Sequence, residues 1–225
     1  MSFVRLFVAL STSCAMAPIA FAQGPIRFQT LDRTAEVDAE TSFDDQPDDC
    51  SQTNEDQTID SSAQDGFFTF DERATASGAG ASVQADALVG STARADRIDF
   101  AADFSVTGSL GNACRVAGGA AGSVNATFTV TREVQAALTG SVELDPLGGP
   151  FDPVSPTAQV ILAGFSPTGG LLSINVLVGG VAGTTEADIF EPVTLYPDAT
   201  YAITIGGGVP IGFDEGVSTT TSATG

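Results

Sequence analysis

The most constraining feature of this sequence is the two-residue alternation that runs through residues 122–144. Apolar residues recur at every second position on both sides of the polar pair Arg132-Glu133. Successive side chains of a β-strand point to opposite faces, so the alternation predicts strand with one apolar and one polar face. The stretch is much longer than the usual strand of about 5–6 residues. We therefore predict two strands that break at Arg132-Glu133 and bend around an edge.

Further alternating runs lie on both sides of this stretch, with turn-forming residues between most of them. Because no helical pattern is present, a second sheet is the simplest partner for the apolar face of the first. The prediction is an all-β fold, a β-sandwich that is jelly-roll-like in its broad form, of about eight to ten strands. The clearest further runs are residues 83–89, 98–106, 158–162, 172–178 and 201–205.

Residues 1–22 have the pattern of a secretory signal peptide. Arg5 supplies the positive charge, an apolar stretch follows, and Ala20-Phe21-Ala22 fits the small-x-small cleavage pattern. The apolar stretch is interrupted by Ser11-Thr12-Ser13 and is too short to span a membrane. The residues before Cys14 lack the branched apolar residue of a lipoprotein leader. We expect export to the extracellular space or the periplasm, with cleavage after Ala22.

Composition narrows the classes of partner. The chain has 28 acidic residues against eight Arg, no Lys and no His, with a formal net charge of −20. Such a charge disfavours nucleic acid, whose phosphates need basic partners, and anionic membrane surfaces. It is compatible with divalent cations or with a saline environment that screens self-repulsion. No stretch after the leader has the roughly 20 apolar residues of a membrane span.

Residues 23–65 form an acidic segment with few apolar residues, a composition typical of chain that does not stay ordered alone. We expect a partly disordered arm here, followed by the sandwich at residues 66–215 and a polar tail at residues 216–225. Once the leader is removed, Cys50 and Cys114 are the cysteines that remain, and a disulfide between them would tether the arm. Such a bridge would stabilise by about 2–4 kcal/mol. The alternative is a metal-binding or catalytic thiol, which has no His and no CxxC spacing to support it.

Two groups of acids are candidate cation ligands, because calcium takes 6–8 oxygen ligands. The denser group is Asp44, Asp45, Asp48 and Asp49, which could supply several carboxylates on one turn without the spacing of an EF-hand. The second is Asp96, Asp99 and Asp103. The alternative for both is a solvated surface. Calcium is the one cofactor that the sequence suggests, and none is required.

Three stretches carry a resemblance. Residues 73–87, RATASGAGASVQADA, alternate Ser, Ala and Gly; residues 137–140 end a strand in LxG; and residues 195–201, LYPDATY, are similar to an L-x-P-G-x-Y turn with Asp198 in place of Gly. Across residues 73–205 the chain resembles exported bacterial β-sandwich proteins of the PEP-CTERM or choice-of-anchor type. The resemblance implies a secreted sandwich without an established activity. That family's sorting signal, a Pro-Glu-Pro before an apolar helix and basic residues, is not found here, so anchoring is not carried over.

The absence of His removes the Ser-His-Asp and Cys-His triads and ordinary His-ligated zinc sites. The Gly-x-Ser-x-Gly, HExxH and P-loop motifs are absent too, so we assign no catalytic residue. The leading hypothesis is a secreted, non-catalytic structural or interaction module of a bacterial surface or extracellular matrix, whose partner is an unidentified extracellular molecule or a glycan. The alternative is a calcium-assisted carbohydrate-binding module, although the chain has no Trp and only Tyr196 and Tyr201. A sandwich-type glycoside hydrolase or lyase is the second alternative.

Overall fold

The computed structural model describes residues 2–12, 24–43, 52–109, 115–145, 157–165, 170–179, 185–197 and 199–214. These residues form twelve β-strands and no helix. Among them, no helix has the length and apolar character needed to cross a membrane. The strands are β1 (Ser2–Thr12), β2 (Ile26–Phe43), β3 (Gln52–Ser62), β4 (Gly66–Gly78), β5 (Ala81–Arg94), β6 (Arg97–Ser109), β7 (Arg115–Val130), β8 (Val134–Asp145), β9 (Thr157–Phe165), β10 (Leu171–Gly179), β11 (Thr185–Leu195) and β12 (Thr200–Asp214).

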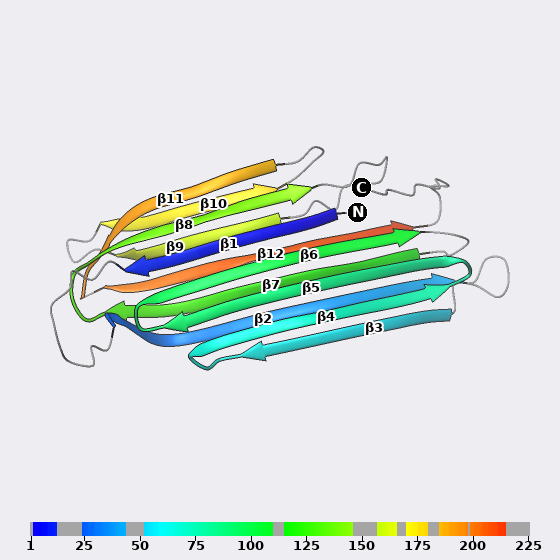
Figure 1. Cartoon of the computed structure of the whole chain (residues 1–225), viewed down its shortest axis with the longest axis horizontal. Coiled ribbons are helices and arrows are strands. Elements are labelled where there is room, and N and C mark those ends of the chain that lie inside the picture. The colour runs from blue at the N-terminus through cyan, green and yellow to red at the C-terminus, as the bar shows by residue number, and fades with distance from the viewer. Residues whose placement is uncertain are drawn as a thin grey trace.

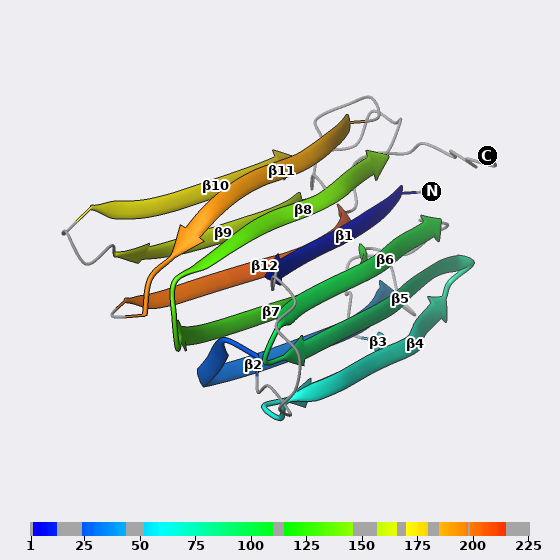
Figure 2. The same ribbon diagram turned by 60° about the vertical axis from the view of Figure 1, so that its left-hand side comes forward.

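The strands form two six-stranded sheets that pack face to face (Figures 1 and 2). Sheet A has the order β11-β8-β1-β6-β5-β4, and sheet B has the order β10-β9-β12-β7-β2-β3. Every pair of neighbouring strands is antiparallel. The predicted all-β sandwich is confirmed. It has more strands than predicted, because the predicted leader and the predicted acidic arm contribute β1, β2 and β3.

The alternating stretch that predicted the fold forms the corner between the two sheets. β7 ends at Val130 in sheet B, and β8 begins at Val134 in sheet A, so the chain changes sheet across Arg132-Glu133 as predicted. Along β7 every second residue is buried, and the residues between them are partly exposed on the outer face. The alternation therefore encodes one face toward the partner sheet and one face away from it.

The core lies between the sheets and is built from the inward-facing residues of both. Phe128 and Tyr201 stack with their ring centroids 5.5 Å apart. Gly164 faces the ring of Tyr201 so closely that a Cβ atom would collide with it, so this position needs glycine. The backbone N–H of Tyr196 donates a hydrogen bond of 2.7 Å to Tyr201 Oη. This bond closes the turn between β11 and β12, within the LYPDATY stretch.

Two strands lie within the segment predicted to be a partly disordered arm, and for these two strands the prediction of disorder is wrong. β2 lies between β7 and β3, and its inward residues Ala35, Val37 and Ala39 are buried. Its acids occupy the alternate positions and point outward. The composition of a segment averages over both faces of a strand. It therefore does not reveal the alternation that gives β2 one buried face. β3 is exposed along nearly all its length, yet it pairs with β2 from Arg33↔Ser62 to Phe43↔Gln52.

Part of the predicted leader also lies in a sheet. β1 pairs with β6 on one side and with β8 on the other, and the side chains of Val8 and Leu10 are fully buried. Residues 13–23, which include the predicted cleavage site, lie outside the described residues, so cleavage stays a prediction. Because β1 is antiparallel to both neighbours, β6 and β8 run parallel to each other. Removal of β1 would leave two parallel strands flanking an empty position.

Candidate interaction surfaces

The predicted calcium ligands Asp44, Asp45, Asp48 and Asp49 lie outside the described residues, as do Cys50 and Cys114. The strand ends that flank them are described. Gln52 pairs with Phe43, and Arg115 pairs with Ser42. The two connections therefore leave the same end of sheet B, from β3 and β7, which are two strand spacings or about 10 Å apart. The calcium site and the disulfide stay predictions, and this placement is compatible with the disulfide.

The second group of acids does not converge. Asp99 and Asp103 lie on β6, four residues apart, which at about 3.4 Å per residue separates them by about 14 Å. Asp99 Oδ2 forms an ion pair with Arg97 Nε at 2.8 Å, and Asp96 lies in the preceding turn. Within the described part of the chain, no group of three Asp, Glu, Cys or His residues could hold a metal ion. Asp99 and Asp103 belong to the outer face of sheet A, and Asp96 belongs to the exposed turn that precedes β6.

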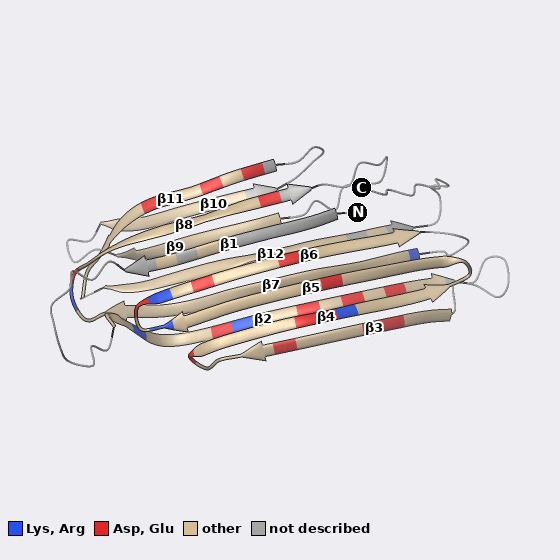
Figure 3. Ribbon diagram, viewed as in Figure 1, with Lys and Arg blue, Asp and Glu red and all other residues tan. Residues whose placement is uncertain are grey.

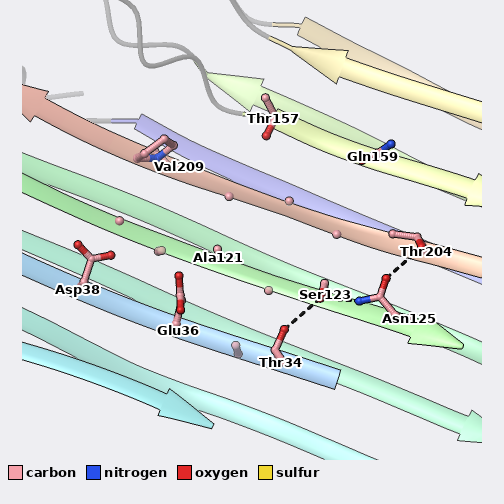
Figure 4. Close-up of a pocket in the computed structure, with 18 residues that line it drawn as sticks. Thr34, Glu36, Asp38, Ala121, Ser123, Asn125, Thr157, Gln159, Thr204 and Val209 are labelled. Atoms are coloured by element: carbon pink, nitrogen blue, oxygen red, sulfur yellow. Dashed lines mark hydrogen bonds between the residues drawn. The ribbon is translucent and has the colours of Figure 1, made fainter. Parts of the chain in front are cut away.

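An open trough of about 660 Å³ crosses the outer face of sheet B (Figure 4). β2 forms one wall with Thr34, Glu36 and Asp38, and β9 forms the other with Thr157 and Gln159. The floor consists of Gly and Ala residues of β7 and β12. One row across it reads Glu36, Ala121, Gly208 and Thr157, a span of about 14 Å at 4.8 Å between strands. The sequence alone could not reveal this trough, because it requires the register of four strands.

The trough is closed at one end by a line of hydrogen bonds across three strands. Thr34 Oγ1 and Ser123 Oγ lie 3.0 Å apart, Asn125 Nδ2 donates to Ser123 Oγ at 3.2 Å, and Thr204 Oγ1 donates to Asn125 Oδ1 at 3.0 Å. At the other end Asp38 leans over Gly119, where a Cβ would lie 2.8 Å from Asp38 Oδ1. The surface thus offers hydroxyl, amide and carboxylate groups around a flat floor.

Asp38 is the acid whose ionisation the fold disfavours. Its half-burial raises the pKa of the carboxyl above its ordinary value, and the neighbouring charges of Glu36, Glu40 and Glu55 raise it further. Glu40 and Glu55 face each other across β2 and β3, so like charges gather at this end of sheet B. Arg115 Nη1 approaches Glu40 Oε1 at 4.0 Å. The region is an acidic surface on which repulsion between neighbouring carboxylates opposes folding.

A buried arginine lies at the opposite end of the β2–β3 pair from Glu40 and Glu55, where Arg33 pairs with Ser62. Arg33 is on the inward face of β2 and only 1% exposed. Its guanidinium donates to the carbonyl oxygen of Gly66 at 3.1 Å, to Ser62 Oγ at 3.1 Å and to the carbonyl oxygen of Gln64. It also lies 5.5 Å from the ring centroid of Phe68. These bonds fix the turn between β3 and β4, so Arg33 joins the outer strands of the two sheets.

The two sheets have four outer strands, and three of them carry charge. A charged or Pro-containing edge resists pairing with another chain. β10 differs, because its sequence LLSINVLVG has no charged residue and no Pro. Figure 3 shows acids along β3, β4 and β11 and none on β9 or β10. The charged edge residues are Glu55, Asp56 and Asp60 on β3; Asp71, Glu72 and Arg73 on β4; and Glu186, Asp188 and Glu191, followed by Pro192, on β11.

β10 has an apolar inner face, and its outer face carries two exposed leucines beside Ser173 and Asn175. Leu172, Ile174 and Val176 are half-buried against the core. Leu171 and Leu177, on the opposite face, are each 67% exposed, and Phe165 on β9 is 64% exposed. β10 pairs with β9 along one edge, and no described residue pairs with its other edge. An uncharged, apolar strand with one unpaired edge is a template for strand addition.

Comparison with protein-family models, with curated proteins and with solved structures gives no significant match.

Proposed function

We propose that this protein is a secreted, non-catalytic β-sandwich that serves as a structural or interaction module of a bacterial surface or extracellular matrix. The observation that carries the proposal is the uncharged edge of β10 in a chain whose net charge is −20. An exposed apolar edge is usually avoided by monomeric proteins, and where it is kept it indicates an interaction site. The signal-peptide pattern of residues 1–22 supports location outside the cytoplasm.

The test produces the full chain with a C-terminal tag in a Gram-negative bacterium. Mass spectrometry of the exported product gives its N-terminus, and washing of the envelope and matrix fraction measures its retention. We expect a product that begins at Gln23 and is retained, and we expect release when Leu171 and Leu177 are both changed to Glu. A product confined to the cytoplasm with residues 1–22 intact would contradict export. Retention that is unchanged in the variant would contradict the role of β10.

The trough favours a second candidate, a carbohydrate-binding module. Sugar hydroxyls are recognised by carboxylate, amide and hydroxyl groups of the kind that Glu36, Asp38, Asn125 and Gln159 present there. A glycan array probed with and without calcium tests this candidate. Binding that is lost in Glu36→Gln and kept in Glu186→Gln, which removes the same charge on β11, would support it. No binding to any glycan in either buffer would eliminate it.

A further inference from the structure

We propose that β10 of one molecule pairs with β10 of a second copy, antiparallel and centred on Ile174, so that the two B sheets become one continuous sheet. The inference rests on the proposed function, because it names the partner of the β10 edge. A two-fold interface requires a surface that is complementary to itself. The sequence of β10 meets that requirement.

Residues 171–177, LLSINVL, read as the same chemical pattern in both directions about Ile174. Antiparallel pairing about this residue places Leu171 opposite Leu177 of the partner subunit, Leu172 opposite Val176 of the partner subunit, and Ser173 opposite Asn175 of the partner subunit. Every apolar residue then faces an apolar residue, and each polar residue faces a polar one. Such directly opposed pairs are the unit that stabilises a sheet.

The same register places the inner face of one copy beside the inner face of the other, and the outer face beside the outer face. Leu172, Ile174 and Val176 are half-buried against the core, while Leu171, Ser173, Asn175 and Leu177 are exposed on the outer face. Because side chains alternate with period two, a shift by one residue would place the inner residues of one copy opposite the outer residues of the other. Centring on Ile174 joins inner face to inner face. The half-buried aliphatic groups of both copies then cover one another.

Charge favours a second copy at this edge over the other three outer strands. Two chains of net charge −20 repel, and the other three edges carry acids. The sequence from residue 153 to residue 185, which contains β9, β10 and the connection between them, has no charged residue at all. The general repulsion between copies is screened by salt, whereas an apolar, backbone-paired contact is not weakened by it. Association through β10 should therefore strengthen as salt rises.

The test is sedimentation velocity of the full chain over a concentration series, at low and at high sodium chloride. We expect a monomer–dimer equilibrium that shifts toward dimer with salt. The double variant Leu171→Glu and Leu177→Glu places like charges opposite each other twice and should be monomeric. The double variant Leu171→Lys and Leu177→Glu places opposite charges together in the proposed register, so the dimer should return.

Two control variants separate this edge from general surface effects. Phe190→Lys on β11 and Leu88→Lys on β5 alter side chains that are 71% and 54% exposed, and the dimer should remain in both. A wild-type chain that stays monomeric throughout, a dimer that survives the Glu-Glu variant, or a Lys-Glu variant that stays monomeric would each overturn the proposal. A monomer that is nevertheless retained in the matrix fraction would overturn the pairing and leave the proposed function standing. A dimer that is never exported would support the pairing and overturn the proposed function.

Discussion

The two outer strands of sheet B, β3 and β10, differ in the charge that they present to other chains. β3 carries Glu55, Asp56 and Asp60 along an almost fully exposed strand, and β10 carries no charge and exposes two leucines. β3 is held by polar bonds to the other sheet: Asn54 Nδ2 donates to the carbonyl oxygen of Ser77 at 2.6 Å, and the backbone N–H of Thr75 donates to Asp56 Oδ2 at 2.9 Å. One edge is closed to other chains by its charge, and the other is left open.

The difference shows that an edge strand can be stable for two reasons. β3 buries almost nothing and depends on side-chain hydrogen bonds and on Arg33 behind it. β10 depends on β9 and on its own aliphatic side chains. A chain with many acids tolerates one apolar edge because the negative charge on its other surfaces opposes aggregation between copies. The following predictions test whether the two outer strands of sheet B differ in this way.

Before any cleavage, the fold that carries both outer strands includes β1 in sheet A, and Leu10→Ala tests whether β1 belongs to the core of that uncleaved chain. Leu10 is fully buried, and a buried Leu→Ala change costs about 2–5 kcal/mol. Urea unfolding of the uncleaved full chain should show a loss of that size. Leu88→Ala, at an exposed position of β5, should change the free energy of unfolding by less than about 0.5 kcal/mol. Equal stability of Leu10→Ala and wild type would mean that β1 is not part of the native core.

Arg33→Ala tests the support of the turn between β3 and β4. The change leaves the carbonyl oxygens of Gly66 and Gln64 without their charged donor, and we expect a loss of about 3 kcal/mol in the free energy of unfolding. Arg73→Ala is the matched control, because Arg73 Nε pairs with Asp86 Oδ1 at 2.5 Å on an exposed face and should cost no more than about 1 kcal/mol. Similar losses in the two variants would contradict a special role for Arg33.

Asp38→Asn should give a small stabilisation at neutral pH. The pKa of Asp38 is raised in the folded state by half-burial and by neighbouring acids, so its contribution favours folding below the unfolded pKa and is lost as pH rises through the folded pKa. Thermal melts should show a gain for the variant at pH 7 that disappears near pH 3, where both states are protonated. Asp188→Asn removes the same charge on β11 and controls for net charge. A gain of equal size in both variants would assign the effect to general repulsion.

Much of the fold could be predicted because the alternation of β7 and β8 reports directly which residues face the partner sheet. The continuation of β2 beyond Leu31 was not predicted, although it alternates equally well through Ala35 to Ala39, because its outward acids dominated the composition. The signal that could have revealed this part of β2 is that Glu36, Asp38 and Glu40 stand at alternate positions, as on one face of a strand. Arg33 stands on the other, apolar parity, so its burial is readable only after the strand is recognised.

The candidate surfaces were harder to predict. The trough joins residues of β2, β7, β12 and β9, which are brought together only by the sheet order. The edge position of β10 likewise depends on topology, since β9 and β10 look alike in sequence but, among the described residues, β9 is paired on both sides and β10 on one. The absence of charge between residues 153 and 185 was a usable signal. It indicates an unusual surface only once the strand is known to lie at an edge.

The central claim is that β10 is an open edge that pairs between copies while β3 is closed. Hydrogen–deuterium exchange of the full chain, measured at low and at high protein concentration, tests it most directly. We predict that the backbone amides of residues 171–177 become more protected as concentration rises and that those of residues 52–62 do not change. Unchanged exchange in β10, or an equal gain of protection in β3, would contradict the account.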